Sequence, residues 1–235
     1  MTHILLTGAS RGIGAACAVA FDLHGINLAS HATRPALGVL AADFADPAAP
    51  RALWDAALDE LGGRIDVLVN NAGVFEASPL DAADDAWVAQ WERTMRINLT
   101  AAAELSRLAV LHWQRRGKGG RLINVASRAA YRGDSPAHWH YAAAKAGMVG
   151  MTKSIARGYA RDGILAFSVL PGFTMTGMAE EYLASRGGDA LLADIPLGRV
   201  ASADEVAEVV RWCALQAPAS MTGAAIDVNG ASFVR

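Results

Sequence analysis

The stretch "TGASRGIG", residues 7–14, lies between a short apolar run and a segment rich in alanine. Its glycines, Gly8, Gly12 and Gly14, allow a tight turn between a strand and a helix and let the backbone come close to a phosphate. The amino end of the helix then offers that phosphate free N–H groups and the positive end of a dipole. The stretch predicts a nucleotide site at the carboxyl end of a first strand. Its spacing differs from the common G-x-G-x-x-G pattern, so a plain tight turn is the alternative.

Short apolar runs alternate with longer amphipathic segments along the rest of the chain. This alternation predicts an α/β fold in which a doubly wound parallel sheet carries helices on both faces. With 235 residues, 53% of them hydrophobic, the chain is long enough for one large core, and we expect a single domain over residues 1–235. The expected strands, about seven, are residues 3–7, 26–31, 39–43, 65–70, 121–126, 165–170 and 224–228.

Two sequence signals mark helices. Ser202 followed by Glu205 is a capping box that opens a helix over 203–216, and Asp46 before Pro47 starts an earlier helix. That earlier helix should end at the paired glycines 62–63.

The link between the second and third strands is unusually short. Only seven residues separate His31 from Val39, about 24 Å of extended chain. That length can run back along a strand but cannot include a helix. We therefore expect a bare loop there.

Composition excludes several classes of protein. The formal charge is −2 and the basic residues are scattered, so no basic stripe indicates nucleic-acid binding. No uncharged apolar run approaches the ~20 residues that span a bilayer, and no cleavable leader is apparent, so we expect a cytoplasmic protein. Cys17 and Cys213 lack the spacing of metal ligands and are expected to be buried, reduced thiols, without a metal site.

The end of the second strand bears on the choice of nucleotide. A ribose with a free 2′-hydroxyl usually meets an acidic residue there, and none is present. Instead, His31, Thr33 and Arg34 follow the strand, and Arg11 lies in the glycine stretch. These residues could surround a 2′-phosphate, which favours NADP over NAD. The alternative is that Arg34 is merely solvated.

Tyr141 and Lys145 lie one helical turn apart in "HWHYAAAKAG", residues 138–147. Residues four apart share a helix face, and a lysine beside a phenol stabilises the phenolate, which would lower a pKa of ~10. Ser127 ends the strand at 121–126 and could hold a substrate oxygen near the phenol, although such a serine is more commonly a turn residue or helix cap. Asn98, within a helix-like segment, would ordinarily face water or bend the helix.

Together these residues resemble the short-chain dehydrogenase/reductase family, in its compact single-domain branch, and among its members those like 3-oxoacyl-acyl-carrier-protein reductases. The resemblance covers nearly the whole chain and implies a three-layer Rossmann-type fold, here without the helix between strands two and three. The matching motifs are "TGASRGIG" at 7–14, "NNAG" at 70–73, Asn98, Ser127, Tyr141 with Lys145, "PG" at 171–172 and "DVNGA" at 227–231.

The resemblance also implies roles for individual residues. Tyr141 would be the acid/base, Ser127 would position the reacting oxygen, and Lys145 would lower the pKa of the phenol and bind the nicotinamide ribose. Asn98 would hold a water that links Lys145 to solvent. The implied cofactor contacts are Gly8, Ser10, Arg11, Ile13 and Gly14 at the phosphates, Asp43 and Phe44 near adenine, Asn70, Ala72 and Gly73 along the ribose, and Pro171, Gly172, Thr174 and Thr176 at the nicotinamide.

The expected activity is NADP(H)-dependent hydride transfer between nicotinamide and a carbonyl or secondary alcohol. An NAD-dependent alcohol or sugar dehydrogenase is the main alternative. A non-catalytic NADP-binding regulator would be expected to lose Tyr141, Lys145 or Ser127, and an epimerase or dehydratase of the longer branch would need an added region. The alanine-rich segments 100–113 and 140–157 resemble the family's subunit contacts, which implies a homotetramer or homodimer, although such faces can also pack inside one subunit.

The substrate remains open at this level. Segments 128–139 and 173–198 should line its cleft, and their residues would suit an aromatic ketone, a sugar or an acyl thioester. Arg132 could bind an anion, but a surface arginine is the better interpretation. The expected cleft residues are Tyr131, Arg132, His138, Trp139, Met175, Met178 and Tyr182.

Overall fold

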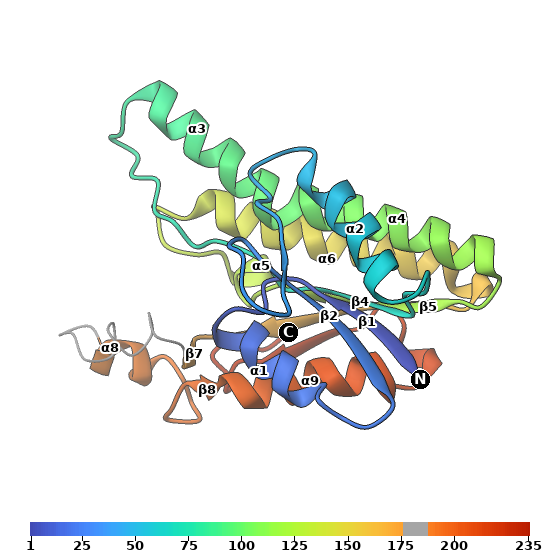
Figure 1. The fold of residues 1–235 in the computed structure, drawn as a ribbon. Coiled ribbons are helices and arrows are strands. Elements are labelled where there is room, and N and C mark those ends of the chain that lie inside the picture. The colour runs from blue at the N-terminus through green and yellow to red at the C-terminus, as the bar shows by residue number, and fades with distance from the viewer. Residues whose placement is uncertain (176–187) are drawn as a thin grey trace.

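One parallel sheet with helices on both faces forms the body of the protein (Figure 1). The computed structural model describes residues 1–175 and 188–235. The strand order is β3-β2-β1-β4-β5-β6-β9, so the chain reverses its direction of winding between β1 and β4. The seven strands are β1 (Thr2–Leu6), β2 (Ile26–Ala32), β3 (Leu40–Ala41), β4 (Val67–Asn70), β5 (Gly120–Val125), β6 (Ile164–Pro171) and β9 (Ala225–Val228). The predicted doubly wound sheet is confirmed.

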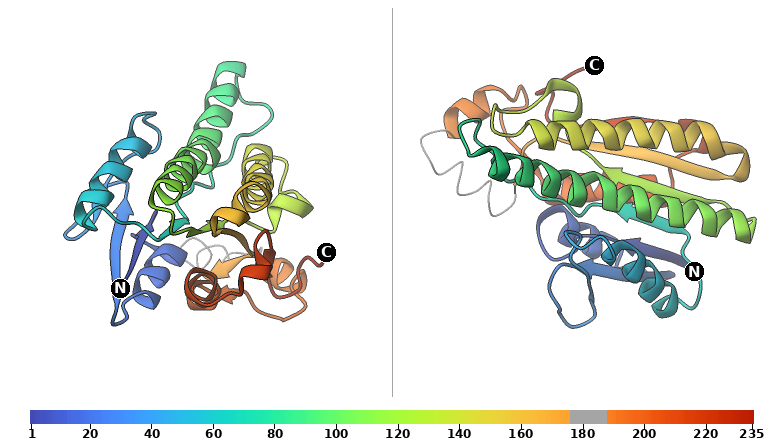
Figure 2. Two further views of the ribbon diagram at one scale, coloured as in Figure 1. Left: turned by 90° about the vertical axis from the view of Figure 1, so that its right-hand side faces the viewer. Right: turned by 90° about the horizontal axis from the view of Figure 1, so that it is seen from above.

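The helices form two layers (Figures 1 and 2). Helices α1 and α9 cover one face of the sheet, while α2, α4 and α6 cover the other. The helices are α1 (Gly12–Ala20), α2 (Ala49–Glu60), α3 (Asp84–Met95), α4 (Ala101–Arg116), α5 (Ala129–Arg132), α6 (Trp139–Tyr159), α8 (Gly188–Ala193) and α9 (Ala203–Leu215), with short turns η1 (Arg96–Thr100), η2 (Ala160–Asp162) and η3 (Ala219–Met221).

Side-chain alternation along the strands divides the core in two. In β1, Ile4 and Leu6 pack in the cluster under α1 and α9, while Leu5 packs in the cluster under α2 and α4. Both faces of each central strand are therefore buried, which explains why the strands read as continuous apolar runs. Cys17 and Cys213 are both free and buried in the cluster under α1 and α9, and burial raises the pKa of each thiol to about 12.

The predicted helix signals appear with one shift. The Ser202 hydroxyl accepts from the Glu205 N–H, and the Glu205 carboxylate accepts from the Ser202 N–H, so the capping box of α9 is confirmed. Helix α2 begins at Ala49, later than predicted, because the Asp46 carboxylate accepts from the Ala48 N–H and holds a turn before the helix. Gly62 and Gly63 follow its end with φ of +66° and +80°.

The link between β2 and β3 contains no helix, as predicted. Residues 33–39 form a loop in which Ala36 and Val39 make one antiparallel bridge. β3 pairs with β2 over only two residues and is shorter than the predicted strand at 39–43. A second small sheet, β7 (Thr174–Met175) beside β8 (Ala201–Ser202), was not predicted, because two-residue strands have no recognisable pattern.

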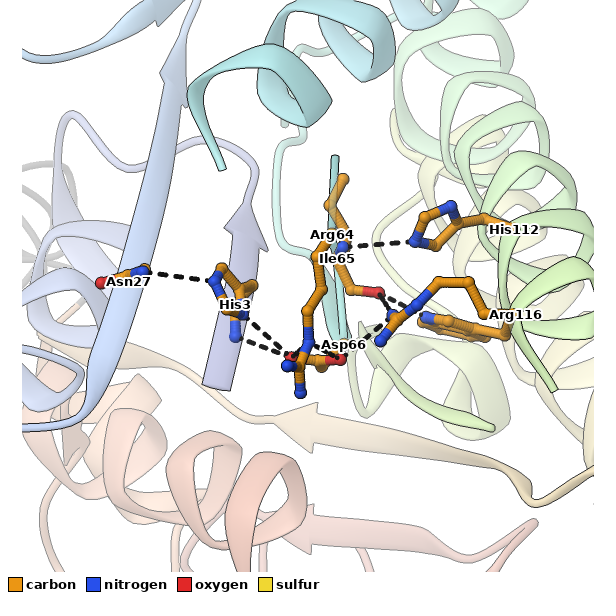
Figure 3. A network of polar contacts seen from close by, with 8 residues as sticks. His3, Asn27, Arg64, Ile65, Asp66, His112 and Arg116 are labelled. Carbon is orange, nitrogen blue, oxygen red and sulfur yellow. Dashed lines mark hydrogen bonds and ion pairs between the residues drawn. The ribbon is translucent and has the colours of Figure 1, made fainter. Parts of the chain in front are cut away.

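A polar network closes the amino-terminal edge of the sheet, opposite the predicted site (Figure 3). The Asp66 carboxylate accepts hydrogen bonds from Arg64, Arg116 and the backbone of His3. Burial raises the pKa of Asp66, but these hydrogen bonds outweigh it and lower the pKa to about 2. Ile65, just before this network, stays outside the sheet because its carbonyl accepts from the Trp113 indole and its N–H donates to His112.

No helix within residues 1–175 and 188–235 is both long and apolar enough to cross a membrane.

Candidate active site

The glycine turn between β1 and α1 is packed so tightly that side chains do not fit. Gly8 has φ of +70°, and a Cβ there would lie 2.7 Å from the Ala72 Cα atom. A Cβ on Gly14 would lie 1.9 Å from the Gly8 carbonyl oxygen. Helix α1 begins after Arg11 without a side-chain cap and has no acidic residue in its first turn. Its amino end can therefore accept an anion, so the residues present fit the pyrophosphate of a dinucleotide.

Two residues that the sequence reasoning missed hold this turn in place. The Asn71 side chain donates to the carbonyls of Thr7 and Gly8, both at 3.0 Å. The Thr7 hydroxyl accepts from the N–H groups of Asn71 and Ala72. Both residues belong to quoted motifs, and a polar side chain beside a glycine turn was the signal available in the sequence.

The side chain of Asn70 is bound within the protein, so the predicted contact with the ribose would have to come from its backbone. Its amide is buried and donates to Asn124 at 2.9 Å and to Ser106 at 3.1 Å. Alternation along β4 causes this, because adjacent strand residues point to opposite faces. Ala72 and Gly73 lie beyond the strand, next to the glycine turn and to Lys145 respectively.

His31 is likewise not placed to bind a phosphate. Its ring is buried and stacked on Phe44 with centroids 4.5 Å apart. Nδ1 accepts from the Gly8 N–H at 3.2 Å, so Nε2 carries the proton that is donated to the Ala42 carbonyl at 2.9 Å. Burial lowers the pKa of His31, so the ring is neutral at pH 7. Its hydrogen bond from Gly8 helps to hold the glycine turn in place.

Other residues predicted to contact the adenosine end are accessible. Ser10 and Arg11 in the glycine turn, Thr33 and Arg34 after β2, and Asp43 after β3 are all exposed. Phe44 is buried and its ring stacks on His31. This arrangement does not favour contact between the Phe44 side chain and adenine.

Ser127, Tyr141 and Lys145 come together at the carboxyl edge of β5. The Ser127 hydroxyl lies near the Tyr141 phenol and acts on its pKa. The Lys145 Nζ atom lies 5.7 Å from the centre of the Tyr141 ring and donates to the Val125 carbonyl at 2.8 Å. A Cβ on Gly73 would lie 3.7 Å from the same Nζ atom, so the three side chains adjoin the loop that supports the glycine turn.

The ionisation of the tyrosine differs from the prediction. Burial, with a smaller contribution from the charge of Asp134, raises the pKa of Tyr141 to about 12, and the nearby Ser127 hydroxyl offsets this only in part. Burial also lowers the pKa of Lys145 to about 8. The pKa of the phenol is therefore raised, not lowered as predicted, because loss of solvation is the largest influence on it and Lys145 is not among the groups that shift it. At neutral pH the phenol keeps its proton and can donate it.

Asn98 is fully buried in η1, a π-helical turn between α3 and α4. Its side-chain oxygen accepts from the Val74 N–H at 2.8 Å, and its amide donates to the Val74 carbonyl at 2.9 Å. The asparagine thus anchors the segment that follows Gly73, and the helix is locally distorted, as one of the two sequence interpretations held.

An aromatic wall flanks Tyr141. His138 stacks on Phe75 with centroids 3.9 Å apart, and Phe75 meets the Tyr141 ring edge-on at 4.8 Å. His138 was a predicted cleft residue, and Phe75 was missed because nothing in its local sequence distinguishes it. Trp139 and Met175 are exposed.

Two other predicted cleft residues are engaged elsewhere. The Tyr131 hydroxyl accepts from Lys153 and Arg235, and its ring stacks on Phe233, so it packs against the C-terminal segment. Arg132 donates to Asp194 at 2.6 Å. These contacts arise because α5 turns one face toward the chain end, which local sequence does not encode.

The predicted nicotinamide loop follows β6. Pro171 and Thr174 are buried, and the Thr174 hydroxyl donates to the Gly172 carbonyl at 3.2 Å. Gly172 packs against Asn229, where a Cβ would lie 2.8 Å from the asparagine Cβ. Thr176, Met178 and Tyr182 lie outside the described residues.

A glycine turn before a helix lies at the reversal point of a doubly wound sheet, beside a serine, a tyrosine and a buried lysine. This arrangement defines an NAD(P)-dependent oxidoreductase that acts on alcohol or carbonyl groups. A family model described as Enoyl-(Acyl carrier protein) reductase matches residues 8–231. The chain belongs to the short-chain dehydrogenase/reductase family.

Similar proteins cover nearly the full length of the chain. The 3-oxoacyl-acyl-carrier-protein reductase of Vibrio cholerae is 36% identical over 98% of this chain and 96% of its own. Nodulation protein G of a Rhizobium species is 36% identical over 96% of this chain and 94% of its own. A solved structure from Agrobacterium tumefaciens, provisionally assigned as a 2-deoxy-D-gluconate 3-dehydrogenase and holding NADP, matches with a TM-score of 0.87 and 28% identity over 100% of this chain and 97% of that one.

Proposed function

We propose that the protein transfers hydride between NADP(H) and a carbonyl or secondary alcohol, with Tyr141 as the acid/base. The observation that carries the proposal is the convergence of Ser127, Tyr141 and Lys145 beside the glycine turn. When bound, the nicotinamide supplies or accepts the hydride. Every other part of the chemistry falls to side chains of this chain.

The residues divide the work as follows. Ser127 donates a hydrogen bond to the reacting oxygen and fixes its position beside the phenol. Tyr141 gives its proton to that oxygen during reduction and takes one during oxidation. Lys145, held by the Val125 carbonyl, keeps a positive charge beside the ring and stabilises the phenolate that forms. Asn98 positions the backbone around Val74, and it is also the candidate for holding a water that connects Lys145 to solvent.

The preference for NADP rests on the adenosine end. No acidic residue ends β2, while Thr33, Arg34 and Arg11 are exposed around the glycine turn. His31 is left out of this group because its ring is neutral and buried. Two cationic side chains and a hydroxyl suit a 2′-phosphate better than a neutral ribose.

A reductase screen tests the activity. We expect oxidation of NADPH with at least one of a panel of 3-oxo esters, aromatic ketones and keto acids, and no oxidation above background with Tyr141→Phe. Dissociation constants for NADPH and NADH test the cofactor, and tighter binding of NADH would overturn that assignment. The second candidate is an NAD-dependent sugar or alcohol dehydrogenase. The assignment of the Agrobacterium structure as a dehydrogenase supports that activity, although that structure holds NADP. This candidate would show as faster oxidation of alcohols with NAD than reduction of ketones with NADPH.

We also propose a homotetramer built on α4 and α6, which carry the alanine-rich segments. Light scattering at micromolar concentration should give a tetramer or dimer, and a monomer would contradict the proposal.

A further inference from the structure

Arg128 directly follows Ser127 and is held firmly in place. Its N–H donates to the Pro171 carbonyl at 2.9 Å, which ties it to the loop after β6. The residue is only 8% exposed. Its guanidinium lies over the Phe173 ring, 5.3 Å from the ring centre. A buried cation thus sits between the serine of the active site and the predicted nicotinamide loop.

This guanidinium lacks a full set of partners. Its Nη1 atom is buried and makes no hydrogen bond with any residue of the described ranges. In the described part of the chain, its ion-pair partner is Asp194, whose Oδ2 atom is 3.6 Å away and already accepts a 2.6 Å hydrogen bond from Arg132. One exposed carboxylate is therefore shared by two guanidinium groups.

The two other charged residues known to act on Arg128 give it no hydrogen bond either. Asp134, on the loop after α5, is exposed and acts on Arg128 only through its charge, and Arg132 repels it. A buried charge without hydrogen-bonded partners is costly, and proteins retain one where a ligand supplies the missing partner. Among residues 1–175 and 188–235 the Nη1 donor has no hydrogen-bond acceptor, and an anionic group of a ligand would supply one.

We propose that Arg128 binds an anionic group of the substrate, so that the substrate is an oxo acid or hydroxy acid and not a neutral ketone. A carboxylate suits a guanidinium because two parallel hydrogen bonds can form. Because Arg128 directly follows Ser127 and its guanidinium lies over Phe173, we place the anion on the part of the substrate next to the carbonyl held by Ser127. This inference rests on the proposed oxidoreductase function and narrows its substrate class.

Paired acids and esters test the assignment directly. 3-Oxobutanoate and 4-oxopentanoate are compared with their methyl esters as substrates for NADPH-dependent reduction. We expect the wild type to prefer each acid by at least about tenfold in kcat/KM. Arg128→Met should lower kcat/KM for the acids about 10- to 100-fold, mainly through KM, and change the values for the esters less than about threefold. Arg211→Met, which removes an ion-paired arginine on α9, should leave the acid preference intact.

Asp194→Asn gives a second, independent readout. Removing the Asp194 carboxylate, which competes for Arg128, should lower KM for the acids. If the ion pair of Arg128 with Asp194 serves only to hold the fold, the variant should instead turn over acids and esters equally poorly. Arg128→Lys keeps the positive charge and should retain part of the preference for acids. It provides a readout that does not depend on whether the methionine variant folds.

The outcomes separate this inference from the activity itself. Equal use of acids and esters by the wild type, or equal loss of both in Arg128→Met, overturns the role of Arg128 and leaves the oxidoreductase standing. If no carbonyl in any panel is reduced, the proposed function fails. Calorimetric titration of 3-hydroxybutanoate and its methyl ester into the protein with NADP then judges Arg128 alone: binding of the acid only, lost in Arg128→Met, supports it, and any other result overturns it.

Discussion

Tyr141 and Lys145 respond to burial in opposite directions. The pKa of the phenol rises to about 12 and that of the ammonium falls to about 8, because both charged forms lose solvation. At neutral pH the tyrosine is protonated and most of the lysine is charged. This combination suits reduction, in which the phenol donates a proton and the adjacent cation stabilises the phenolate left behind.

Tyr141→Phe removes the proton donor and keeps the ring that packs against Phe75. We expect turnover to fall at least about 100-fold, while the dissociation constant for NADPH changes less than about twofold. Steady-state kinetics and fluorescence titration measure the two quantities. Tyr159→Phe, near the other end of α6, is the matched control and should retain activity. Full turnover by the Tyr141 variant would refute the acid/base role.

Gly14→Ala tests the packing of the glycine turn. The added methyl group would lie 1.9 Å from the Gly8 carbonyl oxygen and 2.6 Å from the Asn71 amide. We expect the variant to be destabilised by about 1–3 kcal/mol in chemical unfolding and to bind NADPH at least tenfold more weakly. Gly158→Ala, in α6 with nothing within 4 Å of the new Cβ, should instead gain about 0.5–1 kcal/mol. Similar effects at the two positions would contradict the proposed close approach.

At the scale of elements, helix ends with side-chain caps were predictable, while distortions within helices were not. The capping box of α9 depends on two residues three positions apart, a pattern that is local in the sequence. The π turn at η1 depends on Asn98 reaching Val74, 24 positions away. Nothing near Asn98 in the sequence specifies that partner, so only the tertiary structure reveals why the helix is distorted there.

Ser202→Ala should weaken the start of α9. Loss of the hydroxyl leaves the Glu205 N–H without its partner, and such a change at a helix cap costs about 1 kcal/mol. Urea unfolding measures the difference in free energy. Ser154→Ala on α6 is the control, because its hydroxyl donates only to a carbonyl within its own helix. An equal loss in both variants would show that the cap adds no stability of its own.

For the whole molecule, the doubly wound parallel sheet with helices on both faces followed from the alternation of apolar and amphipathic segments, since buried parallel strands need apolar residues on both faces. The positions of site residues could be predicted where they belong to a sequence motif, as Tyr141 and Lys145 do. The direction of a side chain could not be predicted where it depends on alternation along a strand or on a partner distant in the sequence. The His31 ring accepts a hydrogen bond from Gly8 in the glycine turn, and the Asn70 side chain donates to Ser106 of α4. The charged partner of Arg128 is Asp194, which lies 66 positions away in the sequence.

The network around Asp66 makes the stability of the whole fold depend on acid pH. Asp66 precedes β4 and binds His3 of β1, Arg64 beside it and Arg116 of α4, so it joins segments far apart in the chain (Figure 3). Its folded-state pKa of about 2 lies below the ordinary value of 3.8. The unfolded chain therefore takes up the proton first as the pH falls. The stabilisation is complete above about pH 4 and is lost as the pH falls through 2.

Asp66→Asn should therefore lower the free energy of unfolding by about 2 kcal/mol at neutral pH, since each pKa unit corresponds to about 1.4 kcal/mol. The deficit relative to the wild type should shrink steadily as the pH is lowered from 4 toward 2. Urea unfolding at a series of pH values measures this difference. Asp55→Asn, which breaks an exposed pair with Arg51 on α2, should cost much less and show little change over the same range. A deficit for Asp66→Asn that stayed constant down to pH 2 would show that the carboxylate charge does not stabilise this edge of the sheet.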